Sequence, residues 1–339
     1  MRQAPLCQRL SGSPAGFGGN AMNRTATALL AAGAAAVVLA LLFFAGGTRT
    51  GARRLGDEPT VRVEMDENGA VRELPMEEYI MGVVGGEMGR LPAEGGEEQD
   101  WPHEAYAAQA ILARSFALSF LDDEGRVNIS TDVREAQAYR PENITPAIRR
   151  AVEATRGQVM VHRGEYVKAW FHSYSGGHTA TAKEGLNYQE DEPGFVKAVK
   201  LPENRYVPEE HRSWTASFPL SEVSEAIVEL ADVGKVEDVR ILERGPSGRA
   251  TTLEVTGSRG TERVHAAELR IALGPERMKS TLLSRLEVQD GRLVMEGSGF
   301  GHGVGLSQWD AYAMAVEGKK AEEILKAFFN DIEIEKAWD

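Results

Sequence analysis

The sequence predicts a mixed α+β fold, preceded by a single membrane-spanning helix near the N-terminus. Helix-like and strand-like segments do not alternate regularly along the chain, which argues against a sheet built from βαβ units. There is no internal repeat and no glycine pattern of the nucleotide-binding kind. Residues 26–47, ATALLAAGAAAVVLALLFFAGG, carry no charged side chain.

As a helix, residues 26–47 would extend over roughly 33 Å, enough to cross the hydrocarbon core of a bilayer. A cleaved signal peptide is the alternative, but its apolar part runs only about 7–15 residues before a small-residue cleavage site. Whether the segment is ever cleaved stays open. Arginines are equally frequent on its two sides. The short tail of residues 1–25 and the large C-terminal body favour a cytoplasmic N-terminus and an extracytoplasmic body.

Composition limits the possible functions. The chain has 339 residues, 42% of them hydrophobic and 26% charged, which suffices for one substantial core or two modest ones. A net charge of −13 argues against nucleic acid as a partner and against strong attraction to anionic lipids. It does not oppose binding to an uncharged polymer such as a sugar chain. The single cysteine, Cys7, excludes an internal disulfide and a thiolate metal cage.

The first part of the body, after a linker at residues 48–59, predicts one strand and three helices. Residues 61–65 alternate as a strand does, and residues 76–88, MEEYIMGVVGGEM, place their apolar side chains on one helical face. Residues 102–123 form the strongest predicted helix, with a proline at its start. Residues 145–157 form the next helix, which ends at a glycine.

Residues 158–175 predict a hairpin that turns at Arg163-Gly164, since apolar positions alternate in both arms. The character of the chain then changes over residues 214–286. A predicted helix at residues 221–234 is followed by the short strands VRILER, TTLEVTG and ERVHA, separated by turns that contain glycine or serine. This stretch is expected to be a small inserted α/β subdomain.

The C-terminal part predicts another hairpin and two helices. Residues 285–299 form the hairpin, with Asp290-Gly291 as its tight turn. The helices are predicted at residues 307–317 and 321–330.

Glu87 is the first candidate for chemistry. It ends an apolar helix after two glycines, with no basic residue in the preceding turn. Apolar neighbours disfavour the ionised form of a carboxyl group, so such a group can stay protonated near neutral pH and donate a proton to a leaving oxygen. The alternative is that Glu87 simply meets solvent at a helix end.

Residues 172–179, HSYSGGHT, combine two histidines with two hydroxyls and two glycines at the end of a predicted strand. They suggest a loop that presents polar groups, among them Ser173 and Ser175, around a sugar site. An ordinary strand-end turn is the alternative. A zinc site needs three or four protein ligands, and His172 and His178 have no third partner nearby, so no metal is predicted. Whether these two histidines bind a metal stays open.

Two further segments hold polar groups suited to carbohydrate. Asp132, Gln137 and Tyr139 offer a carboxylate, an amide and an aromatic plate, although such a cluster is usually a capped turn. His302 lies among glycines that allow a ligand to approach the backbone. We expect His302 to orient a ligand rather than carry a proton. Gln308 begins the following helix, whose free N–H groups can bind ligand oxygens.

Six blocks of the sequence occur in the order found in one family. They are EEYIMGVVGGEM, AAQAILARSFAL, TDVREAQAY, AVEATRGQVMVHRGEYVKAWFHSYSGGHT, SGR and GSGFGHGVGLSQWDAYAMAVEGKKAEEILKAFF. Together they resemble the stage II sporulation protein D family, which shares its domain with a branch of amidase enhancers. The resemblance runs from about residue 60 to residue 336, so residues 60–339 are expected to form the peptidoglycan-cleaving domain.

The resemblance implies a membrane-anchored lytic transglycosylase that cleaves peptidoglycan glycan strands during engulfment in sporulation. It implies that Glu87 is the acid, and that substrate-cleft positions fall on Arg114, His172, Ser173, His302 and Gln308. Implied partners are a membrane-anchored amidase and a second engulfment membrane protein, with glycan stripped of stem peptides as the preferred substrate. No cofactor is implied. Some members hold zinc through a cysteine near the HSYSGG block, but this chain has none there.

Ordinary glycosidases use two carboxylates, whereas a lytic transglycosylase manages with one, because the substrate's own C6 hydroxyl attacks. Glu87 would first donate a proton and then accept one, and the product would be a 1,6-anhydro ring. Arg114 would either stabilise ionised Glu87 or pair with Glu78 or another surface acid. Two rival readings stay open. One is a non-catalytic amidase enhancer, and the other is a two-carboxylate hydrolase in which Asp132 partners Glu87.

Overall fold

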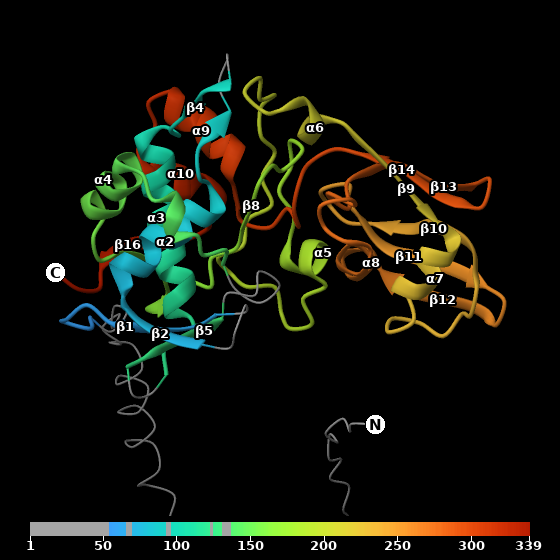
Figure 1. Ribbon diagram of the computed structural model, residues 1–339, viewed down its shortest axis with the longest axis horizontal. Helices are drawn as coiled ribbons and strands as arrows, with labels where there is room; N and C mark the ends of the chain where they lie inside the picture. Colours follow the sequence, from blue (N-terminus) through green and yellow to red (C-terminus); the bar gives the residue numbers. More distant parts are fainter. Residues whose placement is uncertain (1–53, 66–69, 93–95, 123–124, 131–136) are drawn as a thin grey trace, which may run out of the picture. The chain divides into compact units, whose positions relative to one another are not determined.

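The computed structural model describes residues 54–339 except residues 66–69, 93–95, 123–124 and 131–136. Residues 49–339 form one compact unit. The predicted membrane-spanning segment, residues 26–47, lies outside the described residues, as does Asp132. Within the described ranges, no helix is both long and apolar enough to cross a membrane. Helices and strands are mixed without regular alternation, which confirms the predicted α+β class (Figure 1).

The larger hydrophobic core lies in what we call the helical region, residues 54–207 and 306–339. Helices from both ends of the chain meet there: α2, α3 and α4 contact one another, and α9 and α10 contact α3 (Figure 1). The longest, α3, buries nearly all of its residues because alanines let its neighbours approach closely. The helices are α2 (Met76–Glu87), α3 (His103–Leu118), α4 (Pro146–Ala154), α9 (Gln308–Val316) and α10 (Ala321–Phe328).

Small sheets border these helices. Strand β1 (Thr60–Met65) pairs antiparallel with β2 (Ala70–Pro75) and parallel with β5 (Val127–Ser130). A second sheet has the order β16-β6-β7. The remaining strands are β3 (Leu91–Pro92), β4 (Glu98–Gln99), β6 (Gln158–His162), β7 (Glu165–Tyr166), β8 (Phe171–His172), β15 (Leu306–Ser307) and β16 (Ile332–Lys336).

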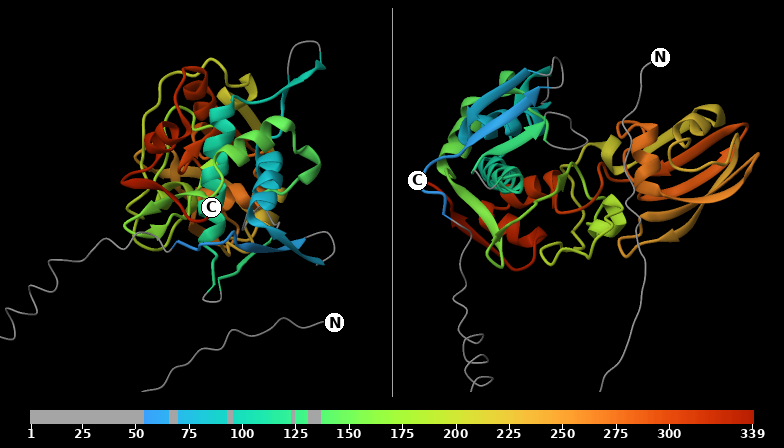
Figure 2. Two further views of the ribbon diagram at one scale, coloured as in Figure 1. Left: turned by 90° about the vertical axis from the view of Figure 1, so that its left-hand side faces the viewer. Right: turned by 90° about the horizontal axis from the view of Figure 1, so that it is seen from below.

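A second core defines the strand-rich region, residues 214–297. Two three-stranded sheets, β10-β11-β12 and β13-β14-β9, enclose it together with helices α7 and α8 (Figure 2, orange and yellow). Its elements are β9 (Trp214–Pro219), α7 (Leu220–Ala226), β10 (Val236–Arg244), β11 (Ala250–Gly257), β12 (Gly260–His265), α8 (Ala266–Leu273), β13 (Leu283–Gln289) and β14 (Arg292–Gly297). Two short helices, α5 (Ala182–Leu186) and α6 (Glu209–Arg212), lie in the segment that leads to it.

The strand-rich region extends beyond the predicted boundary at residue 286. Strand β14 pairs along its whole length with β9, and it contributes Leu293 and Met295 to the second core. The predicted turn of the hairpin is confirmed, because Asp290 and Gly291 have φ angles of 50° and 72°. Positive φ at both central residues is what a two-residue hairpin turn of this kind requires.

Two predicted elements are wrong in part. The hairpin over residues 158–175 exists only as β6 and β7, because β8 pairs instead in parallel with β15. Alternation of apolar residues defines a strand but does not specify its partner. The helix predicted at residues 221–234 ends at Ala226, where the chain turns so that both Ile227 and Val233 reach the second core.

Candidate active site at the end of helix α2

Glu87 is the last residue of α2, and the two glycines before it shape its surroundings. A Cβ atom on Gly85 would lie 2.8 Å from the carbonyl oxygen of Arg140, and one on Gly86 would lie 2.5 Å from that of Ala138. Only glycine therefore lets this backbone segment cross directly over the end of the helix. The approach allows the backbone N–H of Ala138 to donate to Glu87 Oε1 at 2.6 Å.

The carboxyl group of Glu87 is half-buried, and burial raises its pKa to about 7. The hydrogen bond from Ala138 acts in the opposite direction and is the weaker of the two effects. Among the described residues, no charged side chain contributes to the shift. The prediction that apolar surroundings disfavour the ionised form is confirmed. At neutral pH this carboxyl group is present in both protonation states, which suits a group that both donates and accepts a proton.

The segment that crosses the helix end also carries Gln137 and Tyr139. The ring of Tyr139 stacks on Tyr79, with centroids 5.7 Å apart, and covers Gly82. It is 8% exposed, so the structure does not present it as a free aromatic plate for a sugar. Gln137 is 1% exposed, and its amide has no hydrogen-bond partner among the described residues.

The glycine-rich segment before α9 lies against several other side chains. A Cβ atom on Gly301 would lie 2.6 Å from His172 Cβ, and one on Gly303 would lie 2.4 Å from Arg249 Cζ. Both glycines have positive φ angles, 110° and 86°. The glycines are needed here because other parts of the chain, rather than only a ligand, approach the backbone.

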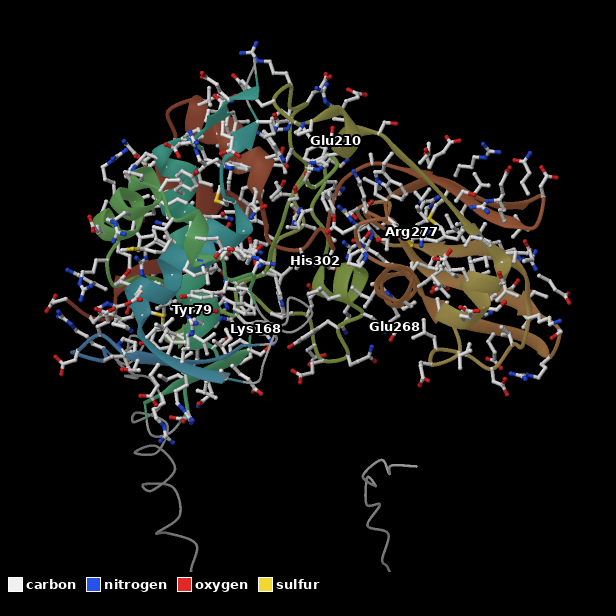
Figure 3. All side chains as sticks on the ribbon, viewed as in Figure 1. Tyr79, Lys168, Glu210, Glu268, Arg277 and His302 are labelled. Carbon is white, nitrogen blue, oxygen red and sulfur yellow. The ribbon has the colours of Figure 1, made fainter. Side chains whose placement is uncertain are left out.

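His302, labelled in Figure 3, forms a pair with His172, and their ring centroids are 5.6 Å apart. Val304 bonds to both rings: its carbonyl lies 3.1 Å from His172 Nδ1, and its N–H donates to His302 Nδ1 at 3.1 Å. These bonds assign the proton of neutral His172 to Nδ1, and they leave its Nε2 as a buried acceptor without a partner in the described part of the chain.

Both imidazoles are neutral at physiological pH. Burial is the main cause, and it lowers the pKa of His302 to about 3 and that of His172 well below its usual value. The positive charges of Arg270 and Arg249 lower both pKa values further. A neutral ring can orient a ligand through hydrogen bonds, but it does not supply a proton near pH 7.

Parallel pairing of β8 with β15 brings two polar loops together, residues 172–179 and the glycine-rich segment, residues 297–305. Trp309 donates its N–H to the carbonyl of Ser173 at 3.0 Å, and Gln308 Nε2 donates to the backbone oxygen of Glu87 at 3.4 Å. Gln308 thus connects the glycine-rich segment with the end of α2. The hydroxyl of Ser175, by contrast, is fully buried and donates to Asp310 Oδ2 at 2.7 Å. Ser175 therefore supports the loop and does not face a ligand.

Arg114 is not at the site, so its assignment to the substrate cleft is wrong. Its side chain is fully buried and forms an ion pair with Glu77, at 2.5 Å between Nη2 and Oε2. It also donates to Thr155 Oγ1 and to the carbonyl of Val152. Helix α3 turns this residue into the core between α2 and α4, and the acid it meets is neither Glu87 nor Glu78.

Two arginines of the strand-rich region were not singled out from the sequence. Arg249, in the SGR block, is fully buried and donates to the carbonyls of His178 and Ser175, both at 2.7 Å. Arg270, on α8, influences both histidines by its charge. Their positions depend on contacts with segments about 30 to 100 residues away in sequence, for which no local pattern exists.

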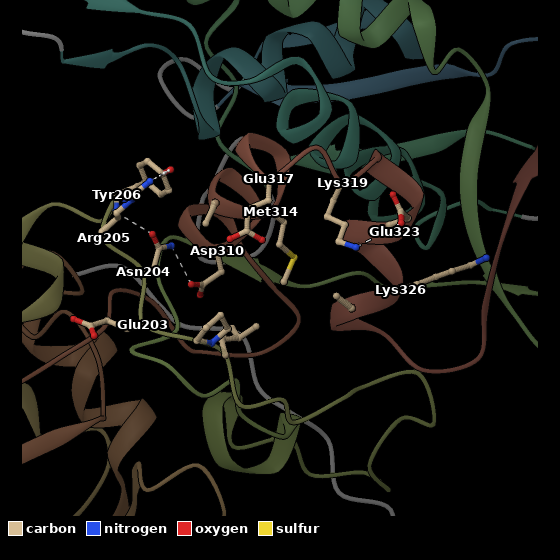
Figure 4. Close-up of a pocket in the computed structure, with 14 residues that line it drawn as sticks. Glu203, Asn204, Arg205, Tyr206, Asp310, Met314, Glu317, Lys319, Glu323 and Lys326 are labelled. Atoms are coloured by element: carbon tan, nitrogen blue, oxygen red, sulfur yellow. Dashed lines mark hydrogen bonds and ion pairs between the residues drawn. The ribbon is translucent and has the colours of Figure 1, made fainter.

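Within the described residues, no group of three or more His, Cys, Asp or Glu side chains could hold a metal ion. A cavity of about 890 Å³ lies elsewhere, between residues 201–206 and helices α9 and α10 (Figure 4). Asp310 lines it and accepts a hydrogen bond from Asn204, and both acidic and basic side chains surround it. Its lining includes neither Glu87 nor the two paired histidines.

Comparisons of the sequence with known proteins find one matching family model, one matching domain of unknown function and several similar proteins. Residues 64–162 match the family model described as Stage II sporulation protein, and residues 190–305 match a domain of unknown function, DUF8618. An uncharacterised protein of Brachyspira hyodysenteriae is 28% identical over 78% of this chain and 67% of its own length. Stage II sporulation protein D of Bacillus amyloliquefaciens is 27% identical over 83% of this chain and 82% of its own.

The amidase enhancer of Bacillus subtilis is also similar, at 25% identity over 68% of this chain, but the match covers 37% of that longer protein. The first family match spans β1 to β6 and therefore includes α2 with Glu87. The relatives named as stage II sporulation protein D match over 83% and 85% of this chain and over 82% of their own lengths. The chain is therefore similar to the stage II sporulation protein D family over most of its length.

Proposed function

We propose that this protein is a lytic transglycosylase that cleaves the MurNAc–GlcNAc bond of peptidoglycan glycan strands and leaves a 1,6-anhydroMurNAc end. The observation that supports the proposal most directly is the state of Glu87. Its carboxyl group is half-buried at a helix end, has a pKa raised to about 7, and is held at one oxygen by a backbone N–H. That is the condition a single acid needs when it must also serve as the base.

The reaction needs one proton donor and no water. Protonated Glu87 donates its proton to the bridging oxygen, and the bond from that oxygen to the anomeric carbon breaks. The C6 hydroxyl of the same muramic acid then attacks the anomeric carbon, and the Glu87 carboxylate accepts the hydroxyl proton. Atoms and charge balance, and Glu87 returns to its acid form. Intramolecular attack supplies the orientation that a free water would lack.

The neighbouring groups orient the sugar in this mechanism. The imidazoles of His302 and His172 lie beside the glycine-rich segment, and because both are neutral they do not compete for the catalytic proton. Gln308 lies between this segment and Glu87. The N–H of Ala138 keeps one carboxyl oxygen in place while the other exchanges the proton.

The setting of the reaction is part of the proposal. Residues 26–47 would anchor the chain in the cell membrane, with residues 60–339 on the extracytoplasmic side at the sporulation septum. The family resemblance adds glycan strands stripped of stem peptides as substrate, and a membrane-anchored amidase and a second engulfment membrane protein as partners.

Incubation of the purified chain with peptide-free glycan strands tests the activity. Mass spectrometry should find anhydromuramyl ends with the natural chain and none with Glu87→Gln. Glu78→Gln is the matched control, because Glu78 lies on the same helix with an exposed side chain. If Glu87→Gln makes as much product as the natural chain, or if the natural chain makes none, the proposal fails.

A second candidate is a non-catalytic amidase enhancer, which the similarity to the Bacillus subtilis protein of that name favours. Such a protein would stimulate an amidase on whole peptidoglycan equally well with Glu87→Gln. The remaining rival, a two-carboxylate hydrolase, would give reducing muramic acid ends that incorporate oxygen from heavy-oxygen water, and it would lose activity with Asp132→Asn.

A further inference from the structure

Arg270 of helix α8 is a buried cation with incomplete bonding. The residue is 7% exposed. Its Nε donates to the carbonyl of Lys279 at 3.0 Å, and its two terminal nitrogens have no hydrogen-bond partner in the part of the chain that the structure describes. Neither terminal nitrogen is among the unpartnered side-chain atoms that are closed off from solvent, so both keep some exposure.

No carboxylate among the described residues forms an ion pair with Arg270. Burial lowers its pKa to about 10, the charge of Glu276 acts in the opposite direction, and the guanidinium stays charged at neutral pH. A charge removed from water is costly unless an opposite charge or several hydrogen bonds compensate it. An anionic ligand would provide both.

The position of Arg270 relates it to the candidate site. Among charged groups, Arg270 has the largest effect on the pKa of His302. The carbonyl of Lys279 accepts a hydrogen bond from Arg270 and a second one, at 2.8 Å, from the N–H of Gly301. Gly301 is the residue before His302. The guanidinium is therefore tied to the glycine-rich segment through one shared carbonyl group.

Two buried arginines lie near the glycine-rich segment, although the whole chain has a net charge of −13. Arg249 and Arg270 both lower the pKa values of His172 and His302. The negative charge of Glu184 raises the pKa of Arg249 and so compensates that arginine in part. Arg270 is paired with no carboxylate among the described residues, so it is the cation that an anionic group on a ligand would complement.

We propose that Arg270, beside the glycine-rich segment, forms a subsite for a carboxylate of the substrate. The planar guanidinium matches the two oxygens of a carboxylate better than a tetrahedral anion or a neutral amide. This inference rests on the proposed function, because in a glycan strand the carboxylate is that of the lactyl group of muramic acid. That group is free when no stem peptide is attached and is a neutral amide when one is. Arg270 is thus the residue that distinguishes stripped from peptide-bearing sugars.

Binding to the Glu87→Gln chain tests the subsite without cleavage. The ligands are short muramyl glycan oligosaccharides in two forms, one with free lactyl carboxylates and one with the same carboxylates converted to methylamides. Isothermal titration should give roughly 10- to 100-fold tighter binding of the carboxylate form, as for a charged hydrogen bond. Adding Arg270→Gln should remove that difference, mainly by weakening the carboxylate form.

Two further variants separate ligand binding from a structural role. Arg270→Lys keeps the charge and should keep part of the preference, although it loses the bond to Lys279. Arg277→Gln is the matched control, since Arg277 lies nearby in sequence but is exposed and pairs with Glu222 (Figure 3). It should keep the full preference.

Equal affinity of the Glu87→Gln chain for the two ligands would overturn the inference, and this result needs no variant of Arg270. An unchanged preference in a folded Arg270→Gln variant would also overturn it, as would Arg270→Lys behaving like Arg270→Gln. If the carboxylate preference is found but the natural chain makes no anhydromuramyl ends, the subsite stands and the proposed reaction fails.

Discussion

The helical region and the strand-rich region each bury arginines but neutralise them differently. In the helical region, Arg114 bonds to both carboxyl oxygens of Glu77 and to two further oxygens, so its charge is balanced inside the core. In the strand-rich region, Arg270 bonds to one carbonyl and has no carboxylate partner in the described residues. The comparison teaches that burial alone does not identify a functional cation. The balance of charge around it does.

The charge balance around a buried group also distinguishes Glu87. Glu87 of the helical region is a half-buried carboxyl with no cation beside it among the described residues, and its pKa is raised to about 7. Under the proposals above, the helical region supplies the proton and the strand-rich region recognises the ligand. The predictions that follow test this division, beginning with the largest effect.

Glu87→Gln should lower the rate of anhydromuramyl formation by about 10²- to 10⁴-fold, the range expected for loss of a general acid. Affinity for carboxylate-bearing glycan should change little, because the ligand-binding arginine lies in the other region. Rates from product analysis and affinities from titration calorimetry check both parts. If Glu87→Gln lost much of its affinity for the glycan while the rate for bound substrate stayed unchanged, Glu87 would bind the ligand rather than supply the proton.

Arg114→Gln should lower the free energy of unfolding by about 3–5 kcal/mol, because it leaves the Glu77 carboxylate buried without its partner. Arg270→Gln should change it by less than about 1 kcal/mol, since one modest hydrogen bond is lost and an unpaired buried charge is removed. Urea denaturation of the two variants measures the contrast. Equal losses would show that the two arginines are equally structural.

Glu87 should also make stability depend on pH. Its folded-state pKa of about 7 lies above the usual 4.5, so the folded chain holds the proton more tightly than the unfolded chain. Stability from this group is complete below about pH 4.5 and decreases as pH rises to about 7. Glu87→Gln should therefore be more stable than the natural chain at pH 8, by on the order of 2–3 kcal/mol. The two should be alike at pH 4, as thermal or urea unfolding would reveal.

The smallest predicted effect concerns the rate as a function of pH. Because the reaction begins with protonated Glu87, kcat/KM should fall by about tenfold per pH unit above the pKa of about 7. The neutral histidines should add no second transition between pH 5 and 7, since the pKa of His302 is about 3. A rate that stays constant to pH 9 would argue against Glu87 as the acid.

Local features of the fold could be predicted from the sequence. Helix α2 begins at Met76, as its pattern indicates, and it ends with the glycine pair before Glu87. The turn at Asp290-Gly291 depends on two adjacent residues and was predicted correctly. In each case the determining interactions lie within a few residues.

Features that depend on distant partners could not be predicted. The pairing of β8 with β15 joins segments far apart in sequence, and the acid that Arg114 meets lies 37 residues away. Helix α8 was missed, so Arg270 could not be assigned to the site. Strand β16, IEIEK, has few apolar residues and was also missed; it is positioned by pairing with β6.

The pairing of β8 with β15 has a consequence for how the protein folds. The bond from Ser175 N–H to Ser307 Oγ closes a loop of 132 residues, and long loops are slow to close. The strand-rich region shortens that loop, because Trp214 and Gly297, at its two ends, are paired neighbours. Once this region has folded, the two polar loops are joined by a much shorter path. We therefore expect the catalytic groups to assemble last, in a chain whose middle part is already native.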